Sequence, residues 1–87
     1  MKNKVLIKIY VPELDFGTDL FLPVNEVLWK IKIMIIQAIS DMTGGALDKQ
    51  KKYMMINKDT SEIYKQNSIL IDTDIRNATE IILLSVK

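Results

Sequence analysis

The sequence lacks the two residue types that most often carry chemistry at protein sites. None of its 87 residues is a cysteine or a histidine, which excludes disulfides, thiolate metal ligands and imidazole bases. The remaining candidates for catalysis are hydroxyls, lysines and carboxylates, and they form no recognisable catalytic spacing. We therefore expect no catalytic residues, no metal site and no cofactor, and a protein that is not an enzyme.

An excess of charge of either sign is also missing. Lys and Arg total 12, Asp and Glu total 11, and the net charge is +1. Such a balance gives no electrostatic basis for binding nucleic acid or an anionic membrane. Arg76 is the single arginine, although arginine dominates direct readout of DNA bases. We expect no nucleic-acid partner.

Long hydrophobic runs are absent as well. No apolar stretch reaches the roughly 20 residues that a membrane span needs, since Lys30, Lys32 and Gln37 interrupt the best candidate. Residues 5–11 alternate in polarity, unlike the continuous apolar core of a signal peptide. These patterns predict a cytoplasmic protein without direct membrane insertion, and the length predicts a single domain over residues 1–87.

What the sequence does contain is one long amphipathic segment. Residues 23–45 predict a helix with Asn25 as its N-cap and the Gly44–Gly45 pair as its stop. At about 100° per residue, one arc of this helix is a normal core-facing stripe. The residues of this arc are Val24, Val27, Leu28, Ile31, Met34, Ile35, Ala38, Ile39 and Met42.

Short runs rich in β-branched residues surround the helix and predict strands. The first two are close enough to form an antiparallel hairpin with Asp15 and Gly17 as turn residues, where Gly17 is expected to supply either a positive φ or a bulge. The last run is apolar on both faces, which places it in the sheet centre. The order β-β-α-β-β-β predicts an α+β domain with one long helix packed across a mixed four- or five-stranded sheet. The predicted strands are residues 5–11, 18–22, 53–56, 62–64 and 80–86.

The last third of the chain resembles the ubiquitin-like β-grasp fold. In that family a Leu-x-Asp-x-x-Ile spacing leads into the final strand, as Leu70, Asp72 and Ile75 do here. Residues 19–24, directly before a long hydrophobic helix, are similar to the YukD/EsaB family. These are small ubiquitin-like proteins of type VII (WXG100) secretion loci in Gram-positive bacteria. The resemblance implies a non-catalytic interaction module that is an accessory or regulatory component of such a system.

Ubiquitin-like modifiers and sulfur carriers end in a flexible tail that closes with Gly-Gly. Here the last predicted strand leads into Ser85, Val86 and Lys87, and YukD/EsaB proteins resemble this chain in lacking such a tail. We therefore expect no conjugation. Two alternatives stay open, namely a modifier or sulfur-carrier type protein and a generic β-grasp binding subunit of another complex.

A second apolar stripe on the predicted helix exceeds what one core requires. Trp29, Ile33 and Ile36 follow an i, i+4, i+7 spacing on the side that should face water. Lys30 and Lys32 flank them. We take these five residues as the candidate partner-binding site, because tryptophan is enriched at the centres of protein interfaces. The resemblance implies a cytosolic domain of the secretion machinery as partner.

The stripe could be covered in more than one way. Within the chain, the loop Ile69–Ile75 or Phe21 would cover it and create one wider core. Alternatively, a protein partner or a second copy of the chain in a homodimer would cover the stripe from outside. A tryptophan with two isoleucines reaches the few hundred Å² that mark interaction sites.

Overall fold

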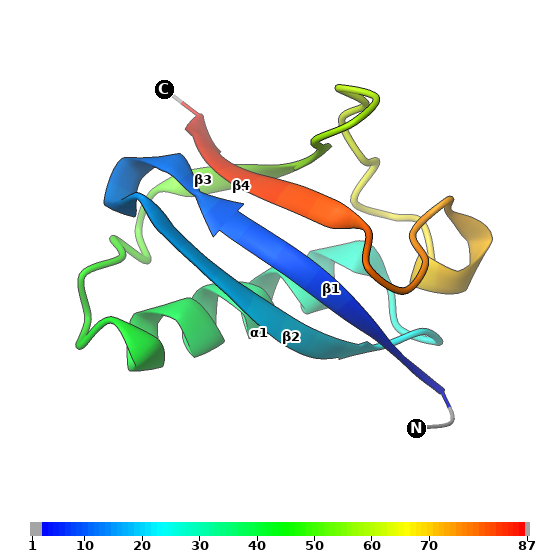
Figure 1. Cartoon of the computed structure of the whole chain (residues 1–87), viewed down its shortest axis with the longest axis horizontal. Helices are drawn as coiled ribbons and strands as arrows, with labels where there is room; N and C mark the ends of the chain where they lie inside the picture. Colours follow the sequence, from blue (N-terminus) through cyan, green and yellow to red (C-terminus); the bar gives the residue numbers. More distant parts are fainter. Residues whose placement is uncertain (1–2, 87) are drawn as a thin grey trace.

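The computed structural model describes residues 3–86, in which one helix crosses a mixed sheet of four strands (Figure 1). The strand order is β2-β1-β4-β3, with β1 and β4 parallel and the two other pairs antiparallel. This confirms the predicted ubiquitin-like β-grasp and the central place of the last strand. Lys87 lies outside the described residues. The elements are β1 (Lys4–Val11), β2 (Phe16–Pro23), α1 (Leu28–Met42), β3 (Lys52–Asn57) and β4 (Glu80–Val86), with 3₁₀ turns at Pro12–Leu14 and Leu70–Asp72.

The hairpin turn between β1 and β2 differs from the prediction in one respect. Gly17 does not supply the positive φ, because it already lies in β2. Asp15 adopts the left-handed conformation instead, with a φ of 46°, which Asp tolerates better than most residues. The hydroxyl of Tyr10 donates a hydrogen bond of 2.7 Å to Asp15 Oδ1 and so links the turn to β1.

The start of α1 also differs from the prediction. Asn25 does not cap the helix, because Val27 occupies the N-cap position and contributes no side-chain hydrogen bond. The backbone of a distant loop provides the cap: the amide of Leu28 donates to Ser68 O at 2.8 Å, and the amide of Trp29 donates to Gln66 O at 2.9 Å. The first amides of a helix have no hydrogen-bond partner within the helix, and here two of them bind carbonyls of this loop instead.

The end of α1 is the glycine stop that the sequence predicts. Gly44 and Gly45 both have positive φ, 65° and 84°. The amide of Gly45 donates to Ser40 O at 2.8 Å, which pairs a carbonyl in the last turn. Glycine is the common residue at such an end because it has no Cβ to clash. The internal glycine pair therefore has a structural role.

The predicted strand at residues 62–64 is reduced to an isolated bridge between Ile63 and Ile56. Two backbone hydrogen bonds, 2.8 Å at the Asn57 amide and 2.9 Å at the Met55 carbonyl, tie this segment to the outer edge of β3. In the part of the chain that the structure describes, the sheet therefore has four strands, the smaller of the two predicted numbers.

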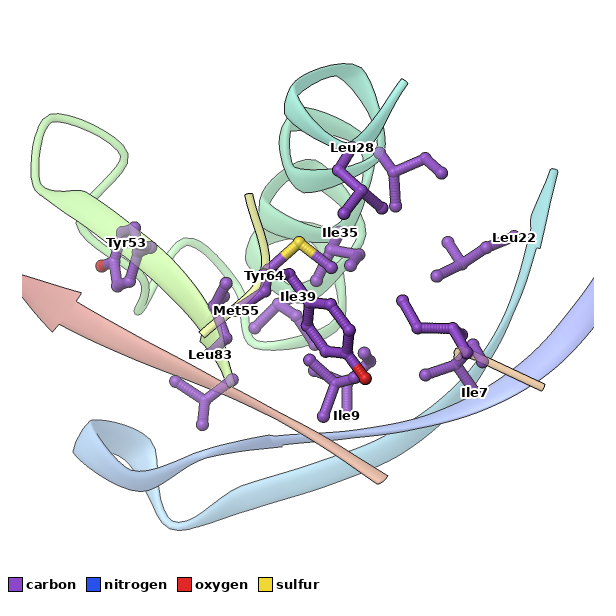
Figure 2. Close-up of a cluster of buried hydrophobic side chains, with 14 of the residues drawn as sticks. Ile7, Ile9, Leu22, Leu28, Ile35, Ile39, Tyr53, Met55, Tyr64 and Leu83 are labelled. Carbon is purple, nitrogen blue, oxygen red and sulfur yellow. The ribbon is translucent and has the colours of Figure 1, made fainter. Parts of the chain in front are cut away.

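The core fills the space between α1 and the sheet. Figure 2 shows Leu28, Ile35 and Ile39 of the helix facing Ile7 and Ile9 of β1, and each of these side chains is at most 1% exposed. A fully buried aliphatic side chain contributes about 1.5–3 kcal/mol relative to an exposed one. This layer accounts for most of the stability of so small a domain.

The buried stripe of α1 is narrower than the predicted arc. Met34 and Met42, which the prediction places in the core, are exposed. Met34 lies at the margin of the arc, and a helix resting on a sheet buries only the side that faces the strands directly. Met42 lies near the middle of the arc but is the last residue of α1, at the end of the buried face. Their thioether side chains therefore remain on the surface.

Tyr64 fastens the segment after β3 to the rest of the molecule. Its ring lies among the core side chains (Figure 2). Its hydroxyl donates to Asp74 Oδ1 at 2.6 Å and accepts from Asn57 Nδ2 at 2.9 Å. Burial and the hydrogen bond to Asp74 raise the pKa of Tyr64 to about 12. One side chain thus joins β3, the segment at residues 62–64 and the loop before β4.

We expect Tyr64→Phe to lower the free energy of unfolding at neutral pH by about 1–3 kcal/mol, because Asp74 and Asn57 lose a buried partner. The pKa of Tyr64 is raised from 10.0 to about 12 in the folded protein. Its contribution is therefore complete below about pH 10 and is lost as the pH rises through about 12. Urea unfolding followed by circular dichroism between about pH 7 and about pH 12 measures both effects.

The difference in the free energy of unfolding between the parent and Tyr64→Phe isolates the contribution of the Tyr64 hydroxyl. The pKa values of Tyr10 and Tyr53 are also raised, by the hydrogen bond to Asp15 and by burial respectively, but both proteins retain these residues. Parallel stability curves for the parent and the variant across this range would contradict the assignment.

Candidate functional site

Two of the three residues in the predicted stripe on α1 are uncovered. Trp29 and Ile33 are 47% and 57% exposed, and they lie one helical turn apart. Ile36 is partly buried and packs against the core, so its assignment to an exposed stripe is wrong. Its place on the helix is the one nearest to the buried face. We call the remaining exposed pair, with Lys30 beside it, the Trp29 surface.

Neither of the internal covers considered for the stripe shields it. Phe21 alternates with the buried Leu22 and therefore lies on the face of the sheet opposite α1. The loop Ile69–Ile75 turns Leu70 inward, where its side chain is buried in the core. Trp29 is consequently open to solvent within a single chain.

The two lysines of the predicted site behave differently. Lys30 Nζ lies 5.4 Å from the centre of the Trp29 ring and 3.8 Å from Glu26 Oε1. A cation over an exposed indole contributes about 0.5–1 kcal/mol, so Lys30 forms a positive rim on the ring. Lys32 instead donates from Nζ to Tyr53 O at 3.1 Å. It fastens α1 to β3 and is not available for the same surface.

A second surface, which was not predicted from the sequence, is the face of the sheet opposite α1. Figure 1 shows α1 on one side of the sheet only. The register places Asp19, Lys8 and Glu80 side by side across β2, β1 and β4. Lys58 Nζ continues this row at 2.9 Å from Glu80 Oε2. Charges of alternating sign therefore cross the uncovered face.

The ion pair at the end of this row is electrostatically coupled. The hydrogen bond to Glu80 raises the pKa of Lys58, and the same bond lowers the pKa of Glu80. Both side chains are well exposed, and such pairs contribute little to stability. The row makes this part of the face polar.

A hollow of about 620 Å³ opens on this face where β2, β1 and β4 meet. Its walls include Lys8, Tyr10 and Asp19, and Gly17 leaves room because it has no side chain. A Cβ at Gly17 would lie 3.6 Å from Ile9 O and 3.8 Å from the Tyr10 ring, which is ordinary contact distance. Neither local backbone geometry nor close packing requires glycine there.

One signal for this surface is present in the sequence. Lys8 and Asp19 alternate with core residues in two strands that pair, so their charges belong on one uncovered face. The alternation assigns Lys8 and Tyr10 to the side away from the core, but the pattern alone does not tell whether another layer covers that side. The hollow depends on the pairing of three strands, which no local pattern reveals.

The described residues contain no group of three or more acidic side chains that could hold a metal ion. Within residues 3–86, no helix has the length and apolar character needed to cross a bilayer.

Comparisons with known proteins support the fold. No protein-family model matches the sequence, and no curated protein matches it. A chain in the structure of the toluene 4-monooxygenase HD complex with the inhibitor 4-bromobenzoate superposes with a TM-score of 0.78 at 4% identity. The match covers 95% of this chain and 99% of that one.

Two further matches come from secretion proteins. The ubiquitin-like domain of the Mycobacterium tuberculosis type VII secretion system protein ECCD1 has a TM-score of 0.72 at 18% identity, over 94% of this chain and 98% of that one. A chain of the MycP5-free ESX-5 inner membrane complex has a TM-score of 0.76 at 10% identity, over 97% of this chain and 21% of that one. At these identities the matches establish the ubiquitin-like fold.

Trp29 is the single tryptophan, so its fluorescence reports directly on the Trp29 surface. We expect acrylamide to quench the native protein nearly as readily as the urea-unfolded chain, because about half of the side chain faces water. Quenching that is weak in the native state at every protein concentration would contradict this exposure. Quenching that weakens only as the protein is concentrated would identify self-association over the ring.

Proposed function

We propose that this chain is a non-catalytic ubiquitin-like interaction module, an accessory or regulatory component of a bacterial type VII secretion system. The observation that carries the proposal is the exposure of Trp29 and Ile33 on α1, each of which is about half open to solvent. The resemblance of residues 19–24 to YukD/EsaB proteins supports the assignment. So does the fold shared with the ubiquitin-like domain of a type VII secretion protein.

The contact that we propose is an apolar anchor with a polar rim. A tryptophan side chain presents about 150–250 Å², and Ile33 extends that area by one helical turn. Lys30 at the rim favours an acidic group on the partner. The partner is a cytosolic domain of the secretion machinery, and the module itself is cytoplasmic. The ubiquitin-like match within the ESX-5 inner membrane complex supports a protein partner of this kind.

A second candidate function is a β-grasp subunit of another complex. The observation that favours it is the match to a chain of the toluene 4-monooxygenase complex, which this chain covers almost completely. Gene neighbourhood separates the two candidates. A WXG100 gene and an FtsK-like ATPase gene beside this gene favour secretion, whereas oxygenase genes favour the second candidate.

The double variant Trp29→Ala with Ile33→Lys tests the proposed contact. We expect a folded protein, because both side chains are exposed, and a loss of partner affinity of at least about 30-fold, as for a tryptophan hot spot. Circular dichroism checks folding. Pull-down of cytosolic secretion domains and the level of secreted substrate measure the effect.

The chain offers a matched control on the same helix. Met34→Lys with Met42→Ala changes two exposed apolar residues that lie off the Trp29 surface. We expect this control to retain partner binding and secretion. If the Trp29/Ile33 variant folds and binds the partner unchanged, the Trp29 surface is not the contact. If both variants lose binding equally, the loss does not depend on Trp29 and Ile33 in particular, and the proposed contact is wrong.

A further inference from the structure

The two edges of the sheet are protected very differently. The outer edge of β3 is occupied by residues 62–64, through the backbone bonds at Asn57 and Met55, and Lys32 occupies the carbonyl of Tyr53. The outer edge of β2 has no such neighbour among the described residues. An open strand edge is a template for pairing with another chain.

The backbone groups that β2 presents at this edge follow from its register. The amide of Val24 donates to Asn3 O at 2.9 Å, and hydrogen-bonded pairs in an antiparallel ladder recur at every second residue. The register from Lys4↔Pro23 to Val11↔Phe16 then directs the even-numbered residues of β2 toward β1. Gly17, Asp19 and Phe21 direct their amides and carbonyls outward.

The side chains of Asp19 and Phe21 lie on the uncovered face of the sheet, and Gly17, which has no side chain, occupies the same face. Gly17 opens the hollow beside Tyr10. The carboxylate of Asp19 has no ion pair within the described residues. Phe21 is 51% exposed. Along one free edge the chain therefore presents a space, a negative charge and an aromatic ring at alternate positions.

We propose that β2 binds an extended peptide strand that carries a basic residue opposite Asp19 and apolar residues at the two flanking alternate positions. The outward backbone groups at Gly17, Asp19 and Phe21 pair with the peptide backbone. A large apolar side chain opposite Gly17 enters the hollow, in the way that aromatic residues cover glycine in neighbouring strands. A second apolar side chain packs on Phe21.

A second copy of this chain fits the edge less well than such a peptide. Two-fold antiparallel pairing centred on the outward groups places Phe21 of each copy over Gly17 of the other, but it sets Asp19 directly against Asp19. Like charges directly opposite destabilise a strand pair, and a charge on an edge strand is a common protection against self-pairing. Asp19 therefore favours a basic partner strand.

The probe for this proposal is a pair of end-capped peptides, Thr-Phe-Thr-Lys-Thr-Phe-Thr and its twin with glutamate in place of lysine. Titration into ¹⁵N-labelled full-length protein should shift the amides of Gly17, Asp19 and Phe21 first. We expect the lysine peptide to bind about threefold to tenfold more tightly than its twin. In the variant Asp19→Lys we expect this preference to be inverted.

Two substitutions at one position separate backbone pairing from side-chain packing. Phe21→Ala removes the ring and keeps the outward amide N–H. Phe21→Pro removes both, and an edge strand tolerates proline where the amide N–H faces solvent. We expect binding to fall further in Phe21→Pro than in Phe21→Ala. If Phe21→Pro does not fold, the inverted peptide preference of Asp19→Lys still tests whether the peptide binds along β2.

The variant Trp29→Ala with Ile33→Lys should bind the lysine peptide like the parent protein, so the outcome here is independent of the proposed secretion contact. The proposal is overturned by equal affinity for the twins, by shifts located away from β2, or by no shifts at millimolar peptide. A concentration-dependent dimer in sedimentation experiments that Phe21→Pro abolishes would also overturn it, in favour of self-pairing.

Discussion

The arrangement of this small domain depends on how the first amides of α1 are paired. No side chain caps the helix, and the carbonyls of Ser68 and Gln66 accept its first two bonds. The same loop is held in turn by a bridge between Val27 and Ile69 and by burial of Leu70. A helix end with unpaired amides would be costly next to the core, so the helix cannot shift without the loop.

That constraint also fixes the Trp29 surface. The backbone of Trp29 is bound to Gln66, and Lys32 is bound to the carbonyl of Tyr53 in β3. These two contacts hold one side of the helix against the loop and β3. The sides of Trp29 and Ile33 that face away from these contacts remain open to solvent, so an apolar pair stays exposed beside a tightly packed core.

The parts of the fold that sequence could predict are those set by local periodicity. Alternation in residues 5–11 and the glycine pair after Met42 both correspond to the observed elements. The helix start could not be predicted, because the segment around Asn25 offers good local capping chemistry and the actual partners lie far away in the chain. Residues 62–64 show strand propensity, but only one bridge forms.

The candidate sites divide in the same way. Periodicity placed Trp29 and Ile33 correctly on the outer side of the helix, since that assignment needs only the angle per residue. It failed for Ile36, which packs against the core, and for Lys32, which is bound to Tyr53 in β3. For the open face of the sheet, alternation assigns Lys8 and Asp19 to the side away from the core, but the full row could not be predicted without the strand order, because Glu80 joins Lys8 and Asp19 only when three strands assemble.

The strand order further determines how the two surfaces relate. Lys32 and Trp29 fasten their side of α1 to β3 and the loop that follows it, whereas the open edge belongs to β2. These two strands lie at opposite ends of the order β2-β1-β4-β3. A partner seated on Trp29 therefore leaves the β2 edge accessible, and a strand paired with β2 does not touch the ring. Since β1 and β4 lie between β2 and β3, the two proposed contacts use opposite ends of the sheet, and the domain offers room for two different segments of protein at once, which a single interaction surface would not.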